Sequence, residues 1–212
     1  MRHTIAIVKQ SGRPAQVRFR ISSITAALFL LIFLSSPLCA QEVVIELDPA
    51  QTQIQFTLSD VLHTVNGTFK LKRGTVRFDP KTGKASGLVV VDVTSGESGS
   101  GMRDRKMHKD ILQSQQYPEA TFKPVQVKGK IDSQAPSQIE VQGIFNLHGS
   151  DHEVTLTFQV HPAGDRLNGT THFVIPYEQW GMKNPSTLFL RVSDKVDIDV
   201  QAVGNTIPAP SH

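Results

Sequence analysis

The sequence predicts an all-β protein: an antiparallel β-barrel of about eight strands with one short helix, preceded by a signal peptide. Three observations carry this prediction. From Glu42 to Val203 apolar and polar residues alternate with a period of two, which is the pattern of half-buried strands. Turn sequences at residues 79–83 and 162–165 separate the alternating rows. A basic stretch followed by an apolar one precedes the first row.

Residues 1–40 have the three parts of a secretory signal peptide. Five basic and no acidic residues lie there, residues 21–34 are largely apolar, and Ala40 is a small residue at the exit. We predict cleavage after Ala40, which leaves a mature chain without cysteine. Two alternatives stay open. One is an uncleaved anchor helix, although a membrane span needs about 20 apolar residues and this run is shorter. The other is lipid attachment at Cys39, although the bulky Leu38 before it does not suit a lipoprotein signal.

The rest of the chain is predicted to be one domain, with the barrel at residues 41–206 and a disordered tail at 207–212. We expect eight to ten strands, mostly joined as adjacent hairpins. The clearest alternating rows lie at residues 54–58, 65–71, 89–93, 139–147, 154–160, 167–175, 188–192 and 196–202.

Residues 101–112 break the alternation. Met107, Ile111 and Leu112 have the spacing of one face of a short helix. A second irregular segment, residues 176–185, carries Trp180 and Met182.

Strands with one apolar face leave two architectures, a sandwich or a closed barrel. Adjacent hairpins favour an up-and-down barrel, and closure removes exposed edge strands. A barrel of eight strands is either filled by its side chains or holds one small ligand. Because the predicted inward rows are rich in valine and include Gly67, Gly143 and Gly169, we expect a cavity.

Composition excludes several classes of protein. The sequence pI is about 9.1, but residues 41–212 hold 17 basic against 19 acidic residues, so no basic nucleic-acid footprint is left. A single cysteine rules out a disulfide scaffold and a zinc module rich in cysteine. His148 and His152 flank a predicted hairpin turn rather than lying on a helix, so we expect no metal site and no cofactor.

Short motifs follow one another in a distinctive order. Arg103-Asp104 opens the helical segment, residues 117–122 read Tyr-Pro-Glu-Ala-Thr-Phe, and Leu147-His148-Gly149 precedes a Val-Thr-Leu strand. Over about residues 43–203 this succession resembles the YceI-like family of secreted bacterial proteins. The resemblance implies a lipocalin-like barrel with an elongated apolar pocket. It also implies a periplasmic location and binding of polyisoprenoids, isoprenoid quinones or related long lipids.

We therefore predict a lipid-binding protein without enzymatic activity, secreted through its signal peptide and holding a long isoprenoid-type lipid for sequestration or transport. A barrel enzyme acting on a lipid and a structural domain with a filled core are the alternatives. A long-chain apolar lipid is the expected partner and nucleic acid is not; transient membrane contact and a homodimer are left open. Arg103 with Asp104 forms either a structural pair or a head-group contact. The residues predicted to bind the ligand are Phe56, Phe69, Val91, Met102, Arg103, Met107, Leu112, Phe122, Phe145, Phe158, Phe173, Trp180 and Met182.

Overall fold

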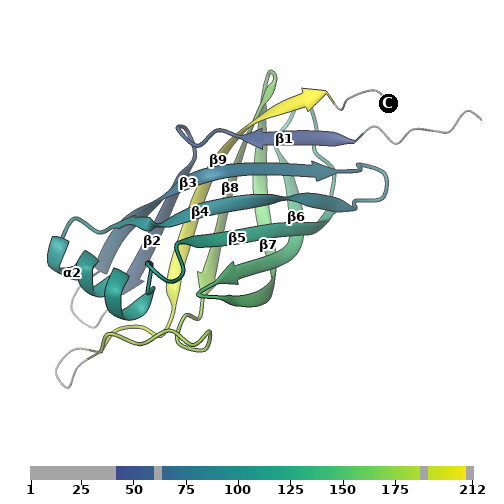
Figure 1. The fold of residues 1–212 in the computed structure, drawn as a ribbon. Coiled ribbons are helices and arrows are strands. Elements are labelled where there is room, and N and C mark those ends of the chain that lie inside the picture. The colour runs from purple at the N-terminus through teal and green to yellow at the C-terminus, as the bar shows by residue number, and fades with distance from the viewer. Residues whose placement is uncertain (1–41, 60–63, 187–190, 209–212) are drawn as a thin grey trace, which may run out of the picture. The chain divides into compact units, whose positions relative to one another are not determined.

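The computed structural model describes residues 42–59, 64–186 and 191–208, so the predicted signal peptide lies outside the described residues. Within these ranges the chain forms nine antiparallel strands, one short α-helix and one π-helical turn (Figure 1). In chain order they are β1 (Val43–Leu47), β2 (Gln53–Ser59), β3 (Thr64–Phe78), β4 (Ala85–Glu97), α2 (Gly101–Lys106), η1 (Met107–Ile111), β5 (Glu119–Lys128), β6 (Ser137–Leu147), β7 (Ser150–Ala163), β8 (Arg166–Ile175) and β9 (Val196–Pro208).

The sheet closes on itself as an eight-position barrel. Its order is β1-β3-β2-β9-β8-β7-β6-β5-β4, and the pairing of β3 with β4 completes the ring. Strands β1 and β2 both lie between β3 and β9, where β1 pairs with one half of each neighbour and β2 with the other half. Strands β1 and β2 together therefore occupy one position of the barrel, and the turn between them divides that position into two halves. The predicted antiparallel barrel with one short helix is confirmed.

Two irregularities change which residues face inward. In β3 the register with β4 shifts between Leu71 and Arg73, and in β5 the register with β6 shifts between Pro124 and Gln126. A β-bulge inserts one residue into a strand, so the inward face moves from odd to even positions or the reverse. For the same reason Val125 lies at the bulge and is 54% exposed.

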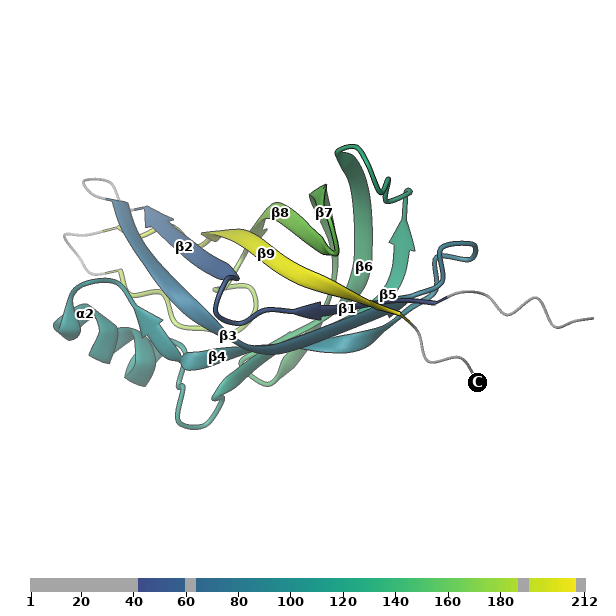
Figure 2. The same cartoon turned by 90° about the horizontal axis from the view of Figure 1, so that it is seen from above.

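One end of the barrel carries the helical segment. Figures 1 and 2 show α2 at the end where β4 finishes, opposite the end that holds β1 and the last residues of β9. Met107, Ile111 and Leu112 pack against a core cluster that also includes Tyr177 and Met182 from the segment after β8. Among the described residues, neither α2 nor any other helical segment has the length and hydropathy of a membrane-spanning helix.

One expectation about a segment boundary needs correction, and another falls largely outside the described residues. Strand β9 continues to Pro208, and Ile207 pairs with Val44, so residues 207–208 belong to the sheet and not to the predicted tail. Pairing with β1 gives the backbone of these residues hydrogen-bond partners within the sheet, in place of the water that would solvate a disordered tail. The strand expected at residues 188–192 falls largely on residues 187–190, which lie outside the described residues.

Candidate functional site: an apolar cavity along the barrel

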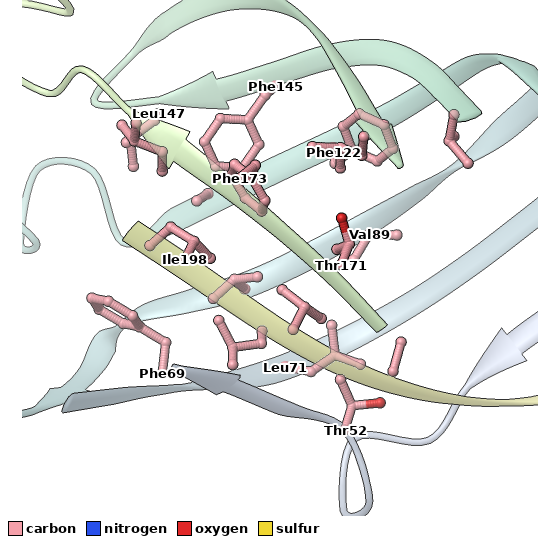
Figure 3. Close-up of a pocket in the computed structure, with 18 of the residues that line it drawn as sticks. Thr52, Phe69, Leu71, Val89, Phe122, Phe145, Leu147, Thr171, Phe173 and Ile198 are labelled. Atoms are coloured by element: carbon pink, nitrogen blue, oxygen red, sulfur yellow. The ribbon is translucent and has the colours of Figure 1, made fainter. Parts of the chain in front are cut away.

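The inward faces of the strands enclose a cavity of about 310 Å³ (Figure 3). This volume lies at the lower end of the range of about 300–1,000 Å³ that is usual for small-molecule sites. The lining runs from Phe78, Val127 and Ile139 near the strand ends opposite α2 to Met107 and Met182 at the helix end. The cavity therefore extends along most of the barrel.

The lining is almost entirely hydrocarbon. Among the described residues that line the cavity, none is Asp, Glu, His, Lys or Arg. The side chains with a hydroxyl group are those of Thr52, Thr171 and Tyr177. Such a surface offers favourable burial to an apolar ligand and no charge to steer a polar one.

Glycines contribute less to the cavity than the sequence predicts. A Cβ atom on Gly67 would collide with the ring of Phe56, which lies over it, and with the carbonyl oxygen of Glu97. The ring of Phe122 covers Gly143 in the same way. The space left by these two glycines is thus filled by aromatic rings, and of the three predicted glycines only Gly169 lines the cavity.

The helix end is built by a wide π-helical turn. Leu112 N–H donates to Met107 O across five residues at 2.8 Å, and this winding brings Met107, Ile111 and Leu112 to the cavity. His108 anchors the turn, because its Nε2 lies 2.8 Å from Gly96 O and its Nδ1 lies 3.1 Å from Ser114 Oγ. The predicted apolar face is therefore present, although the segment winds as an α-helix only over Gly101–Lys106.

Arg103 and Asp104 both hold Ser98. Arg103 Nε donates to Ser98 Oγ at 2.7 Å and Arg103 Nη2 donates to Ser98 O at 2.8 Å. Asp104 Oδ1 accepts from Ser98 N–H at 2.9 Å and also from the Ser98 hydroxyl. Of the two roles considered for this pair, the geometry supports the structural one, which fixes the entry to α2.

Tyr177 ties the segment after β8 to the residues before β9. Its side chain is buried, and its hydroxyl donates to Ser193 O at 2.5 Å. Ser193 N–H in turn donates to Ser59 O at 3.0 Å. Burial raises the pKa of Tyr177 to about 12, and the carboxylates of Glu178 and Asp194 add to the effect.

His148 and His152 pack against two different aromatic rings. His148 and Gly149 have φ angles of 53° and 77° and form the two-residue turn between β6 and β7. The ring of His148 lies 4.4 Å from that of Tyr117, and the ring of His152 stacks on Trp180. Within the described ranges, no group of three or more His, Cys, Asp or Glu side chains could hold a metal ion.

Ten of the thirteen predicted ligand-binding residues line the cavity. They are Phe56, Phe69, Val91, Met107, Leu112, Phe122, Phe145, Phe158, Phe173 and Met182.

The other three predicted residues lie outside the lining. Met102 is 77% exposed in the first turn of α2, and the guanidinium of Arg103 is engaged with Ser98. Trp180 packs against His152 and Phe145, with ring centroids 3.8 Å and 5.9 Å apart. These partners of Trp180 are distant from it in the sequence, so local spacing does not predict the contacts.

Sequence reasoning also missed lining residues. Val76 and Val127 face inward only because the bulges in β3 and β5 shift the alternation. Thr171, which was also missed, stands in the middle of the inward row of β8. Its hydroxyl group in an otherwise apolar row could have identified it from the sequence.

The fold and the cavity together define a closed antiparallel β-barrel with an elongated apolar interior. The model of the YceI-like domain matches residues 46–204. The chain belongs to the YceI-like family, as its motifs suggested.

Curated relatives support the same assignment. Protein YceI of Escherichia coli O157:H7 and its counterpart in Shigella flexneri are both 33% identical to this chain over 101 residues. The match covers 47% of this chain and 50% of each relative. The chain thus spans about half the length of the curated relatives it matches.

Solved structures share the fold at lower identity. BcnA of Burkholderia cenocepacia superposes with a TM-score of 0.61 and 21% identity, over 74% of this chain and 98% of that one. A polyisoprenoid binding domain from Saccharophagus degradans, implicated in plant cell wall breakdown, gives 0.56 and 15% over 77% and 98%. The YCEI protein of Campylobacter jejuni gives 0.53 and 17% over 71% and 88%.

Proposed function

We propose that this protein binds a long isoprenoid-type lipid, a polyisoprenoid or an isoprenoid quinone, inside the barrel and sequesters or transports it in the periplasm. The observation that carries the proposal is the cavity, which runs along most of the barrel and is lined almost only by hydrocarbon. The structural likeness to a polyisoprenoid binding domain supports it.

Hydrophobic burial would supply the affinity. Each CH₂ group removed from water contributes about 0.8 kcal/mol, and association costs about 4–15 kcal/mol of lost freedom. A ligand with a short chain therefore gains little, whereas a chain that fills the cavity gains enough to bind. The proposal includes no catalysis, because the described lining offers no carboxylate, imidazole or amine as general acid or base.

Mass spectrometry of an organic extract tests the proposal directly. Protein purified from bacteria should release a co-purifying prenyl lipid, and delipidated protein should take up added prenyl lipid. Extracts that repeatedly match blank controls, together with no uptake, would overturn the proposal.

N-terminal sequencing of periplasmic protein tests the export step, with a mature chain beginning near Gln41 as the expected result.

The helix end is the proposed site of lipid exchange with a bilayer. Arg105, Lys106 and Lys109 are exposed there together with Met102 and one carboxylate, Asp110, while the same segment presents Met107 to the cavity. This combination of exposed cations beside an apolar interior suits an anionic bilayer surface.

Vesicle sedimentation tests this docking. An Arg105→Gln/Lys106→Gln variant should lose binding to phosphatidylglycerol vesicles, whereas a Lys128→Gln/Lys130→Gln variant, altered at the opposite end, should retain it. Equal binding of both variants would contradict the docking.

The homodimer that the sequence leaves open is tested by light scattering of the purified protein.

A further inference from the structure

Thr171 carries a buried hydroxyl group without a partner. The residue is 6% exposed and lines the cavity, and its Oγ1 makes no hydrogen bond. Figure 3 shows this oxygen among side chains that consist of carbon. A buried polar group that leaves water without gaining a partner destabilises the folded state. Valine has nearly the same shape and would avoid that cost at this strand position.

The other hydroxyl groups of the lining differ from Thr171. Thr52 Oγ1 accepts a hydrogen bond from Val203 N–H at 3.2 Å, and the Tyr177 hydroxyl donates to Ser193 O. Both of these side chains therefore fasten the barrel itself. A water molecule at Thr171 would need two to four polar partners, which the apolar lining does not supply.

The position of Thr171 sets a depth within the cavity. It is the third of five inward residues of β8, between Gly169 and Phe173, and it pairs with Val200 of β9. The hydroxyl thus lies about midway between the helix end and the opposite end. A ligand group that meets it must be buried inside the barrel and cannot protrude from its mouth.

We infer that the Thr171 hydroxyl donates a hydrogen bond to an oxygen acceptor of the bound lipid, a ketone, quinone or ester carbonyl held at mid-barrel. The inference rests on the proposed function and deepens it, because it selects an oxygenated lipid over a plain hydrocarbon. The apolar surroundings strengthen the selection. Apart from the hydroxyl of Thr52, whose oxygen is already held by Val203 N–H, the described lining offers no other unused donor, so a carbonyl away from both threonines loses its hydration without compensation.

Three probes of equal chain length test the inference: n-nonadecane, its methyl ketone and its symmetrical mid-chain ketone. Affinity is measured by displacement of a fluorescent long-chain fatty acid from delipidated protein. Comparing ratios between variants removes the different water solubilities of the probes. In Thr171→Val, the affinity of at least one ketone relative to n-nonadecane should fall about fivefold from the wild-type ratio, which corresponds to about 1 kcal/mol.

Two further variants serve as controls. Thr170→Val makes the same chemical change on the exposed face of the same strand and should leave every ratio unchanged. Thr171→Ser keeps the hydroxyl and should retain the ketone preference, and it carries the comparison with wild type if the valine variant does not fold. Lipid-free Thr171→Val should also unfold at a higher denaturant concentration than wild type, because the unpaired hydroxyl is gone.

The failures of the two proposals are distinguishable. If n-nonadecane binds but neither ketone ratio changes in Thr171→Val, the inference about Thr171 is overturned and lipid binding stands. The same holds if all three affinities fall by one common factor, because the side chain then acts only through its shape. If delipidated protein takes up neither the three probes nor added prenyl lipid, as measured by mass spectrometry of an organic extract, the proposed function itself fails.

Discussion

The imidazole of His152 lies flat on the indole of Trp180, with ring centroids 3.8 Å apart and an angle of 6° between the planes. Burial lowers the pKa of His152 from its ordinary value of 6.5, and the nearby carboxylate of Asp151 opposes this effect. The Nε2 atom is buried without a hydrogen-bond partner, so a proton there would be unpaired. His152 should therefore be neutral when it stacks on Trp180.

This stack predicts a pH transition that tryptophan fluorescence can follow. Trp180 is the only tryptophan of the chain, so its emission reports the charge of His152. We expect a change with a midpoint below pH 6.5 in wild type and none in His152→Gln. His161→Gln, which alters an exposed histidine of the same strand, should keep the transition. A midpoint at or above pH 6.5 would contradict the burial of this imidazole.

The same group makes stability depend on pH. The pKa of His152 is lower in the folded than in the unfolded protein, so the unfolded state binds the proton first. The contribution of His152 to the free energy of unfolding is therefore complete above about pH 6.5 and decreases as the pH falls through the lowered value. In denaturant unfolding at several pH values, His152→Phe should show a smaller loss on acidification than wild type.

Tyr177 makes the opposite prediction in alkali. Its pKa is raised to about 12 in the folded state against 10.0 for the ordinary group, so the unfolded state loses the proton first. The free energy of unfolding should then fall by about 2–3 kcal/mol between pH 10 and pH 12.

Unfolding of Tyr177→Phe tests this assignment. The variant should be less stable at neutral pH by about 0.5–1.5 kcal/mol, because it loses the hydrogen bond to Ser193 O. It should also lose stability more slowly above pH 10 than wild type does. If the two proteins lose stability in parallel above pH 10, the raised pKa of Tyr177 is wrong.

Val91→Trp tests whether the cavity is free for a ligand. Val91 lines the cavity from β4, and the added ring should occupy ligand space rather than displace packed side chains. We expect the lipid-free protein to change in stability by less than about 1.5 kcal/mol and lipid affinity to fall at least about tenfold. Val125→Trp, at an exposed position, is the matched control. Strong destabilisation of lipid-free Val91→Trp would show that the interior is filled at this depth.

Gly67→Ala should destabilise the barrel. The new Cβ would collide with the carbonyl oxygen of Glu97 and the ring of Phe56, and such overpacking typically costs about 1–3 kcal/mol. Gly101→Ala is the control, because the nearest atom to its Cβ would be Arg105 Nη1 at 3.6 Å and alanine favours a helix. Equal stability of Gly67→Ala and wild type in urea unfolding would refute the close packing at Gly67.

The alternation of apolar residues, together with the adjacent hairpins, was enough to predict the barrel and ten of the residues that line its cavity. Phe56, Phe145 and Phe173 occupy inward positions in uninterrupted strands, where the face of a residue depends only on its place in the alternation. The spacing of Met107, Ile111 and Leu112 likewise identified one apolar face of the helical segment. These features are local, so a short window of sequence contains the information that specifies them.

Long-range contacts decided the rest. Val76 and Val127 line the cavity because bulges shift two strands against their neighbours, and Trp180 leaves the lining because His152 provides a flat partner. Phe56 and Phe122 fill the space over Gly67 and Gly143, which the sequence had suggested would be empty.

The amino-acid sequence is enough to show which residues alternate, where the turns fall and that the interior is apolar, because each of these features depends on neighbours along the chain. That Thr171 lacks a hydrogen-bond partner is visible only in the folded barrel. Whether a hydroxyl is satisfied depends on every group within about 3 Å of it. For a residue in a barrel, those groups come from strands that are distant in sequence.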